Sequence, residues 1–571
     1  MDKPFAITLD PGSSLANKTG SWRTERPVYV DLLPPCNHAC PAGENIQQWL
    51  YHAEEGAEQS TDPDTGQGGY EAAWRQIMQD NPLPAIMGRV CYRPCETACN
   101  RAQVDAPVGI NSVERFLGDE AIKQGWTVPV TAPDSGKRVL IVGAGPSGLS
   151  AAYHLRLLGH QVTLRDSAVW AGGMMRFGIP AYRLPRDILD AEIGRILAMG
   201  VTWEGGQQVT DLEAAIADGG FDAAFIAVGA QRGKRAYIPA GDSARILDAV
   251  TLLHSMEGAE RPQLGRRVAV YGGGNTAMDA ARTARRLGAT DAVVVYRRTR
   301  DRMPAHAIEV EEAADEGVRM MWLSTIARAD EGKLTIEKMK LDETGFPQPT
   351  GEYTELEADT VVLALGQEAE LSLLDRVAGV TISGGVVHVG PDLMTGHPGI
   401  FAGGDMVPAE RTVTVAIGHG KKAARSIDAF LRNNPGNEYL APPAESMATA
   451  AQPGSTALAP RLADFSRLNT WYYSDAPATV RPYLDAARRI STFDEVTGGL
   501  DESTALFEAR RCMSCGNCFE CDNCYGVCPD NAVINLGPGR RYEIDLGYCK
   551  GCGICAAECP CGAIDMLPEQ I

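Results

Sequence analysis

The cysteines near the end of the chain constrain its fold and chemistry more than any other feature. Six stand two or three residues apart, at Cys512, Cys515, Cys518, Cys521, Cys524 and Cys528. A second run follows at Cys549, Cys552, Cys555 and Cys559. Cysteines this close cannot form disulfides between folded elements, because a disulfide needs a specific separation and orientation of two backbones. The spacing therefore predicts ligands to metal.

Two of these runs follow the spacing C-x2-C-x2-C-x3-C-P, which is typical of bacterial two-cluster ferredoxins. In that arrangement the fourth cysteine of each run binds the cluster of the other run. The spacing predicts one [4Fe-4S] cluster on Cys518, Cys521, Cys524 and Cys559, and another on Cys528, Cys549, Cys552 and Cys555. Cys512 and Cys515 are left over.

Composition limits the partners and the compartment. A length of 571 residues predicts about four domains. The formal net charge of −20 argues against nucleic acid or an anionic membrane face as a partner. No leader opens the sequence and no apolar run is long enough to span a membrane, so we expect a cytoplasmic protein without a membrane span. In a reducing cytoplasm, clustered cysteines bind metal rather than forming disulfides.

Five more cysteines stand near the amino terminus in two sets with i, i+4 spacing. They are Cys36 and Cys40, then Cys91, Cys95 and Cys99, with helices predicted at 46–57 and 70–79. This spacing places thiols on one face of short helices, as a buried cluster needs. For this segment alone, a zinc site and inert core thiols remain alternatives.

A dinucleotide-binding motif begins after residue 137. The buried strand 138–142 leads into Gly143, Gly145, Pro146, Ser147 and Gly148, and a helix is predicted over 149–158. Such glycines allow a tight turn and close approach of a pyrophosphate, which the helix N-terminus stabilises. Asp166 ends the next strand, where a carboxylate can bind ribose hydroxyls. The context predicts a dinucleotide site.

A second motif of the same kind follows the strand 267–270. It contains Gly272, Gly274, Asn275 and Thr276, and the next strand, 292–296, ends in Arg297 and Arg298, with Arg302 nearby. Arginines at this position suit a 2′-phosphate, which favours NADP(H) over NAD(H). A solvated basic turn is the alternative, and it leaves NAD(H) open.

Gly404 and Asp405, late in the chain, are interpreted as part of the same site as the first dinucleotide motif. A Gly-Asp at a strand end, followed by Thr412 and a helix, is typical of the FAD site in two-dinucleotide flavoproteins. The first motif would then hold FAD, with its domain split around the pyridine-nucleotide domain. No cysteine pair lies near either motif, so electrons leaving the flavin are expected to pass to iron–sulfur clusters.

Together these residues resemble the small subunit of bacterial glutamate synthase, a module also found in the N-terminal half of dihydropyrimidine dehydrogenase and in NADPH–ferredoxin transhydrogenases. The shared segments span about residues 31–432 and are 88–99, 142–148, 172–180, 183–185, 272–279, 296–298, 303–305 and 403–405. The resemblance implies FAD, NAD(P)H and two N-terminal [4Fe-4S] clusters. It adds Gly172, Gly173, Arg176 and Arg183 to the expected FAD site.

The N-terminal clusters depart from the family pattern in one respect. The family has a C-x2-C ahead of the position of Cys36, and this chain does not, yet Glu508 to Cys515 has that appearance at the other end of the chain. We therefore hypothesise that Cys512 and Cys515 fold back onto the N-terminal domain and complete a cluster with Cys36 and Cys99 (the fold-back hypothesis). By resemblance, Cys40, Cys91 and Cys95 would hold a second cluster with Glu114, for which a surface helix charge is the alternative. The total is four [4Fe-4S] clusters, with Cys561 spare.

The predicted fold class is α/β: a tandem Rossmann-like flavoprotein core with a helical iron–sulfur domain before it and an α+β ferredoxin domain after it. The expected domains are a poorly structured N-terminal arm (1–30), the helical domain (31–130), the FAD domain (137–245 and 370–432), the NAD(P)H domain (246–369), a linker and helical return segment (433–511) with a charged helical stretch over 486–511, and the ferredoxin domain (512–571). The linker signature itself lies at 434–458.

The expected function is electron transfer between NAD(P)H and iron–sulfur clusters through FAD, with no side chain needed as an acid or base. A catalytic partner subunit is expected to carry the substrate chemistry. The extra ferredoxin domain favours a 2-oxoacid:acceptor oxidoreductase or another ferredoxin-linked complex. The alternatives are a glutamate synthase large subunit as partner, or a stand-alone NAD(P)H:ferredoxin reductase that uses soluble ferredoxin.

Overall fold

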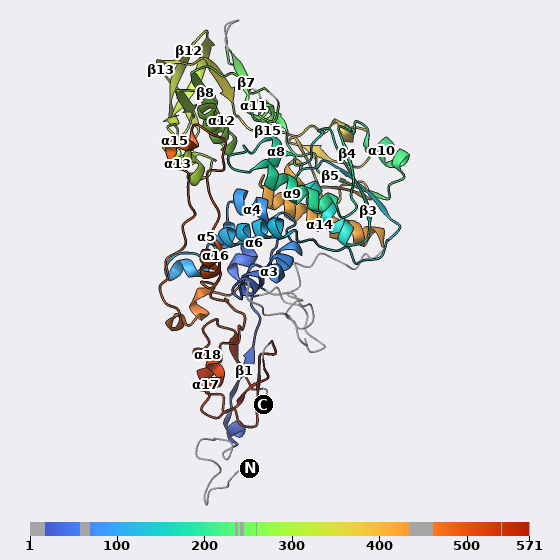
Figure 1. Cartoon of the computed structure of the whole chain (residues 1–571), viewed down its shortest axis with the longest axis vertical. Helices are drawn as coiled ribbons and strands as arrows, with labels where there is room; N and C mark the ends of the chain where they lie inside the picture. Colours follow the sequence, from blue (N-terminus) through green and yellow to red (C-terminus); the bar gives the residue numbers. More distant parts are fainter. Residues whose placement is uncertain are drawn as a thin grey trace, which may run out of the picture.

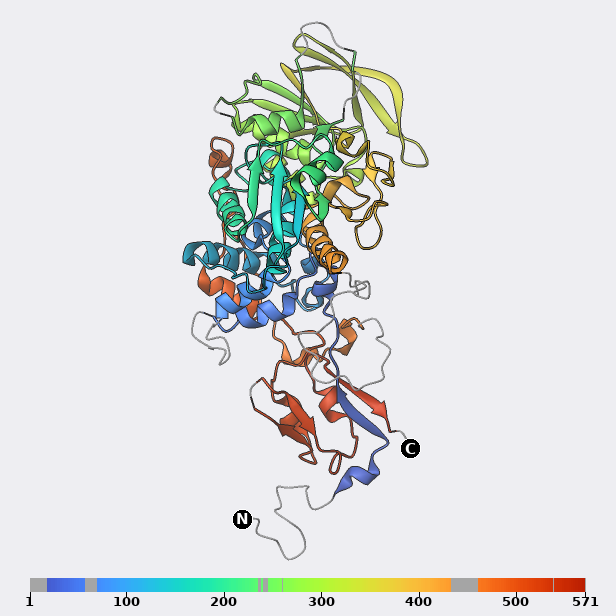
Figure 2. The same cartoon turned by 90° about the vertical axis from the view of Figure 1, so that its right-hand side faces the viewer.

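The protein is elongated, with two dinucleotide-binding sheets at one end, helices in the middle and the cysteine-rich tail at the other end (Figure 1 and Figure 2). The computed structural model describes residues 18–56, 69–234, 238–239, 245–258, 260–432, 461–537 and 539–569. The linker predicted over 434–458 and the first seventeen residues of the predicted arm lie outside these ranges.

The first sheet is parallel and carries the first dinucleotide motif. Its strand order is β18 (Ile400–Ala402), β5 (Ala223–Ile226), β2 (Arg138–Val142), β3 (Gln161–Asp166), β4 (Thr202–Gly205). Its helices are α7 (Pro146–Leu157), α8 (Met174–Phe177), α9 (Arg186–Leu197), α10 (Leu212–Gly219) and α14 (Val413–Leu431). Four of the five residues of β2 are buried, as expected for a strand covered on both faces.

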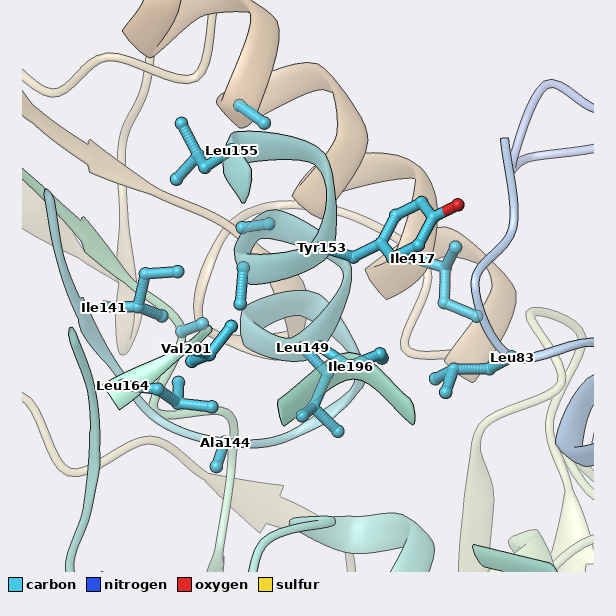
Figure 3. Packing of buried hydrophobic residues seen from close by; sticks show 14 of the residues in the cluster. Leu83, Ile141, Ala144, Leu149, Tyr153, Leu155, Leu164, Ile196, Val201 and Ile417 are labelled. Carbon is cyan, nitrogen blue, oxygen red and sulfur yellow. The ribbon is translucent and has the colours of Figure 1, made fainter. Parts of the chain in front are cut away.

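Helix α7 packs at the centre of the largest apolar cluster. Figure 3 shows Leu149 of α7 lying among Ile141 and Leu164 of the sheet and Ile417 of α14. On its other side Tyr153 donates a hydrogen bond to the carbonyl of Met78, at 2.8 Å. The same core therefore fixes the FAD-type sheet against the helical domain.

The second sheet is also parallel and is inserted between β5 and β18. Its order is β10 (Arg319–Met321), β9 (Asp291–Val295), β8 (Arg267–Tyr271), β14 (Thr360–Leu363), β7 (Ile246–Asp248). Its helices are α11 (Ala249–Ser255), α12 (Asn275–Arg286) and α13 (Ala307–Asp315), and an antiparallel sheet follows: β11 (Ser324–Asp330), β12 (Lys333–Leu341), β13 (Pro347–Glu357). Strands β6 (Arg232–Gly233) and β15 (Gln367–Glu368) pair where the chain crosses between the sheets. The predicted tandem Rossmann-like α/β architecture is confirmed.

The helical domain contains α1 (Pro35–Ala39), α2 (Ile46–Ala53), α3 (Gly69–Met78), α4 (Pro84–Val90), α5 (Pro94–Thr97) and α6 (Ile110–Gln124). Helices α4 and α6 cross closely at two glycines. A Cβ on Gly88 would lie 2.4 Å from the Cα of Arg115, and one on Gly118 would lie 2.3 Å from the amide nitrogen of Ala85. This close crossing sets Cys91, which follows α4, beside Glu114 of α6.

The tail corrects one prediction about the amino terminus. Residues 1–30 were expected to form a poorly structured arm, but Glu25–Tyr29 forms β1, which pairs antiparallel with β21 (Ile564–Pro568). The pairing provides hydrogen-bond partners for the backbone groups of both strands. The two strands lie more than five hundred residues apart in the sequence, so no local pattern predicts their pairing. The tail also contains α17 (Asn523–Val527), β19 (Val533–Asn535), β20 (Tyr542–Ile544) and α18 (Ile554–Ala557).

The return segment that precedes the tail is less helical than expected. A charged helical stretch was predicted over 486–511, but only α15 (Ala486–Arg489) and α16 (Glu502–Ala509) form there. Gly498 and Gly499 stand between them, and paired glycines disfavour a continuous helix. The irregular stretch packs on the helical domain, where Glu495 forms ion pairs with Arg89 at 2.8 Å and Arg115 at 3.0 Å. Within the described ranges, no helix has both the length and the apolarity to cross a membrane.

Candidate functional site

A cavity lies between the two parallel sheets at the amino ends of α7 and α12. Residues from three parts of the chain line it. They are Gly145, Pro146, Ser147, Gly173, Gly404, Asp405 and Thr412 from the FAD side, Asn275, Thr276 and Asp279 from α12, and Val90 and Tyr92 from the helical domain. Arg183 and the crossing residues 227–229 also line it. The cavity thus brings both dinucleotide motifs to one place.

The FAD side of the cavity has the features of a phosphate cradle. Gly143 has φ +107°, and a Cβ there would lie 2.3 Å from the carbonyl oxygen of Ala227, so only glycine fits. The Oγ of Ser147, in the first turn of α7, is buried and has no hydrogen-bond partner among the described residues. Burial raises the pKa of Asp405, and no hydrogen bond to its carboxylate occurs in the part of the chain that the structure describes. These unsatisfied groups fit the phosphate and hydroxyl groups of FAD.

A neighbouring cavity is lined by Asp166, the residue predicted to bind ribose hydroxyl groups. Asp166 lines it together with Gly143, and Val228 and Gln231 line both cavities. The two carboxylate oxygens of Asp166 accept backbone hydrogen bonds from Ala144 at 2.7 Å and Ala168 at 2.8 Å. The predicted FAD site therefore continues from the cavity between the sheets into this neighbouring cavity, at the end of β3.

Other residues predicted for FAD lie behind the cavity. A Cβ on Gly148 would lie 1.9 Å from the carbonyl oxygen of Gly143, so Gly148 serves close packing of α7. Gly172 donates a backbone hydrogen bond to Ala144 at 2.9 Å. The guanidinium of Arg176 donates to the carbonyl of Ala171 at 2.7 Å and to Asp190. Arg176 therefore supports the loop rather than lining the cavity.

The pyridine-nucleotide motif supplies the facing wall. Gly274 caps α12, and a Cβ on Gly272 would lie 2.1 Å from the carbonyl oxygen of Ala364. The guanidinium groups of Arg297 and Arg298, which follow β9, form no ion pair among the described residues, and Arg297 is exposed. The exposed Arg302 lies against Gly345. Unpaired arginines at the end of β9 are free to bind a phosphate.

Tyr92 was not predicted and joins the cavity to the cysteines. Its ring stacks on His306 with the centroids 3.5 Å apart and the planes at 13°. Its hydroxyl accepts a hydrogen bond from Asn275 at 2.7 Å and donates to Glu309 at 3.2 Å. The only sequence signal for Tyr92 is its place beside Cys91.

Arg183 joins the two dinucleotide-binding regions. Although the family resemblance assigns it to FAD, its guanidinium forms ion pairs with Asp279 of α12 at 2.9 Å and with Glu309 of α13 at 2.6 Å. It lies at the edge of the cavity, so a role toward FAD and a role between domains are compatible.

The first N-terminal thiol set surrounds a small cavity of its own. Cys36, Cys99, Cys512 and Cys515 all line it. Burial raises the pKa of Cys36 well above its ordinary value, and the charges of Cys512, Cys99 and Cys515 add to this effect. The structure thus brings together the four cysteines of the fold-back hypothesis.

The second set comprises Cys40, Cys91 and Cys95 with Glu114, and Cys40 and Cys95 belong to the same apolar cluster as Cys36 and Cys99 of the first set. Burial, and then the charges of Glu44, Cys91 and Glu114, raise the pKa of Cys40. Burial raises the pKa of Cys95 as well, with further contributions from Cys40, Cys91 and Glu114. Glu114 is 6% exposed, which excludes the surface-charge alternative. The Oγ1 of Thr414, at the start of α14, donates to the Sγ of Cys91 at 3.3 Å, so this set adjoins the flavin side.

The tail cysteines lie near each other in the groups that the ferredoxin spacing predicts, in which the last cysteine of each run joins the other run. Burial raises the pKa of Cys518 to about 11, and the charges of Cys524 and Cys559 contribute. Burial likewise raises the pKa of Cys555 to about 12, with the charges of Cys549, Cys524, Cys528 and Cys552 contributing. Cys561, the spare cysteine, is buried with its sulfur 3.7 Å from that of Cys559.

All sixteen cysteines are free thiols. Within the described residues, no three His, Cys, Asp or Glu side chains converge as a single metal ion would require. The N-terminal sulfurs instead line or flank spaces between elements. Buried thiols with raised pKa values stay protonated until a metal centre replaces their protons. The donor sets fit iron–sulfur clusters.

Two parallel dinucleotide-binding sheets facing one cavity, with buried thiol sets beside it, define a flavin- and pyridine-nucleotide-dependent iron–sulfur oxidoreductase. Comparison with known proteins agrees. Residues 137–420 match the pyridine nucleotide-disulphide oxidoreductase family, and residues 32–126 match dihydropyrimidine dehydrogenase domain II, which carries a 4Fe-4S cluster.

This chain matches most of the length of three curated relatives. The NADP(+)-dependent formate dehydrogenase subunit beta of Moorella thermoacetica is 36% identical over 85% of this chain and 71% of its own. The NAD-dependent dihydropyrimidine dehydrogenase subunit PreT of Escherichia coli is 31% identical, over 70% of this chain and 91% of its own. The glutamate synthase [NADPH] small chain of Escherichia coli is 31% identical, over 69% of this chain and 88% of its own length. The chain belongs to the glutamate synthase small-subunit-like family of FAD- and NAD(P)H-dependent iron–sulfur oxidoreductases.

Proposed function

We propose that this chain is the electron-transfer subunit of a larger oxidoreductase, moving electrons between NADP(H) and four [4Fe-4S] clusters through FAD. The single observation that carries the proposal is the cavity between the sheets, because residues of both dinucleotide motifs and of the Cys91 loop line it together. FAD, when bound, supplies the exchange between a two-electron hydride and single electrons. We propose that the chain is divided into the domains that the sequence predicts, with the FAD domain split around the NAD(P)H domain.

The chain's own contribution is orientation and insulation. Ser147 and the amide groups at the start of α7 would hold the FAD pyrophosphate, and Asp405 would accept hydrogen bonds from hydroxyl groups of the bound cofactor. Asn275 and Thr276 would hold the pyridine nucleotide on the facing wall. Tyr92 and Val90, the two neighbours of Cys91 in sequence, line the cavity, so the second thiol set would lie beside the bound cofactors.

We expect Ser147→Ala to weaken FAD binding without destabilising the protein. Its Oγ has no partner in the protein, so the apoprotein loses nothing, whereas a hydrogen bond to a phosphate contributes about 1.5–3 kcal/mol. FAD affinity should fall about tenfold or more, measured by FAD titration of apoprotein. Ser150→Ala is the matched control, because Ser150 lies in the same helix but donates to the carbonyl of Ile417 at 2.8 Å. Equal FAD loss in both variants would contradict the assignment.

We expect Arg297→Ala combined with Arg298→Ala to separate NADPH from NADH. Loss of charge-assisted hydrogen bonds to a 2′-phosphate costs about 1.5–3 kcal/mol each, so the Kd for NADPH should rise at least about tenfold while that for NADH stays constant. Arg300→Ala is the control, since exposed Arg300 pairs with Glu311 at 3.4 Å. Equal weakening of both nucleotides would show that these arginines do not read the phosphate.

The partner is proposed from the relatives. The formate dehydrogenase subunit match spans 85% of this chain and the glutamate synthase match 69%, so the first kind of complex accounts for more of the chain. A catalytic subunit of a formate-oxidising complex is therefore favoured over a glutamate synthase large subunit, and a 2-oxoacid-oxidising subunit is proposed from the ferredoxin tail alone. The free thiols support a cytoplasmic location.

Purification from the native cell under anaerobic conditions tests the partner. We expect a catalytic subunit to co-purify with the chain, and its identity would settle the substrate. A lone chain with full activity toward soluble ferredoxin would instead support a stand-alone reductase and remove the subunit assignment.

A further inference from the structure

The return segment places a buried cation against the helical domain. Arg481 is 9% exposed, and its guanidinium lies over the first turn of α6. Its Nε donates to the Oγ of Ser112 at 2.7 Å, Nη1 donates to the carbonyl of Gly88 at 3.0 Å, and Nη2 donates to the Oδ1 of Asn111 at 2.7 Å. All three acceptors are neutral.

No carboxylate pairs with Arg481 among the described residues. Glu96 accepts the backbone hydrogen bond of Asn111 at 2.9 Å and lies 3.8 Å from Arg93. Burial, and then the charges of Arg93 and Arg115, lower the pKa of Arg481 to about 10, although the charge of Glu96 opposes this decrease, and Arg481 stays charged at neutral pH. A buried cation without a counter-ion is costly, so its retention points to negative charge nearby.

With a cluster bound, the second thiol set would supply negative charge in addition to that of Glu96. The Nδ2 of Asn111 donates to the Oε2 of Glu114 at 3.2 Å and to the carbonyl of Met87 at 2.9 Å. Because Arg481 occupies Oδ1, the amide is held with Nδ2 toward Glu114. Arg481 is therefore one side chain away from the group that, with Cys40, Cys91 and Cys95, forms this set.

We propose that Arg481 is a positioning residue that raises the reduction potential of the cluster held by Cys40, Cys91, Cys95 and Glu114. The inference rests on the proposed function. Reduction adds one electron and breaks no bond, so a nearby buried cation stabilises the reduced state more than the oxidised state. Since Cys91 adjoins the flavin-side cavity, this cluster would be the first electron acceptor beyond it. The return segment would thus set the driving force of that step.

The test is a potentiometric titration of the holoprotein, followed by electron paramagnetic resonance. The relevant cluster signal is the one lost or altered in Cys91→Ser. We expect Arg481→Gln to lower its midpoint so that the reduction equilibrium falls about tenfold, or about 59 mV for one electron. Arg481→Lys, which keeps the charge, should retain most of the wild-type potential. Arg488→Gln, an exposed arginine of the same segment, should change nothing.

A second variant covers a failure of Arg481→Gln to assemble. Asn111→Asp keeps Arg481 but gives it a carboxylate partner, so it should lower the same midpoint. Unchanged potentials in these variants would overturn the proposal, as would equal shifts in Arg481→Lys and Arg481→Gln. If wild-type protein shows no cluster signal that depends on Cys91, the proposed function fails first and this inference fails with it.

Discussion

Replacing both Cys512 and Cys515 by serine is expected to remove one N-terminal cluster and leave the tail clusters intact. Iron should fall from about sixteen to about twelve atoms per chain, since each [4Fe-4S] cluster contains four irons. The physical reason is that these two cysteines supply half of the thiols around the cavity of Cys36 and Cys99. Iron analysis and cluster-specific resonance signals measure the outcome.

The structure shows how a segment so distant in sequence is held there. Buried Glu508 accepts the backbone hydrogen bond of Gly109 at 2.6 Å, and buried Arg511 donates to the carbonyls of Pro107 at 2.9 Å and Ala106 at 2.7 Å. These contacts dock the end of α16 just ahead of Cys512. Cys561→Ser is the control and should keep all the iron. Full iron in the double variant would contradict the fold-back hypothesis.

Replacing Glu316 by glutamine is expected to destabilise the pyridine-nucleotide domain by about 3–5 kcal/mol, because two buried arginines would lose their shared counter-ion. Arg282 donates to Glu316 at 2.8 and 3.0 Å, and Arg286 donates at 2.6 and 2.9 Å. Burial opposes ionisation of Glu316, but the hydrogen bonds from Arg286 and Arg282 outweigh it and lower its pKa. Both arginines lie on α12, whose first turn carries Asn275 and Thr276.

Hydrogen exchange of the α12 and α13 amides measures this effect within a multidomain protein, where a single unfolding transition is not assured. Exchange should accelerate at least about a hundredfold, and NADPH binding should weaken. Glu343→Gln changes an exposed acid of the same domain and should alter stability by less than about 0.5 kcal/mol. Unchanged protection of α12 in Glu316→Gln would show that the arginines are satisfied in another way.

Local patterns predicted much of this molecule. The strand 138–142 coincides with β2, and the helix expected from 149 lies within α7, because buried strands and glycine-rich turns are specified by neighbouring residues. Ligand spacing predicted a group of Cys518, Cys521 and Cys524 with Cys559, and the charge of Cys559 acts on the other three thiols, so the four lie near one another; their binding of one cluster stays a prediction.

Contacts between distant segments could not be predicted in this way. The pairing of Val28 with Asp565 has no signal in either strand alone, and the course of the return segment depends on side chains such as Arg481 that resemble surface arginines in sequence. Tyr92 was missed for the same reason, since its partners Asn275 and Glu309 lie in another domain. Family resemblance placed Arg176 at FAD, but a buried arginine can equally hold a loop, as it does through Ala171.

Anaerobic titration of the purified holoprotein with NADPH tests whether electrons pass from the nucleotide through the flavin to the clusters. We expect flavin absorbance and iron–sulfur absorbance both to bleach, with electrons distributed over one FAD and about four clusters per chain. Bleaching of the flavin alone, with the cluster absorbance unchanged by excess NADPH, would contradict an electron path from the cavity to the thiol sets.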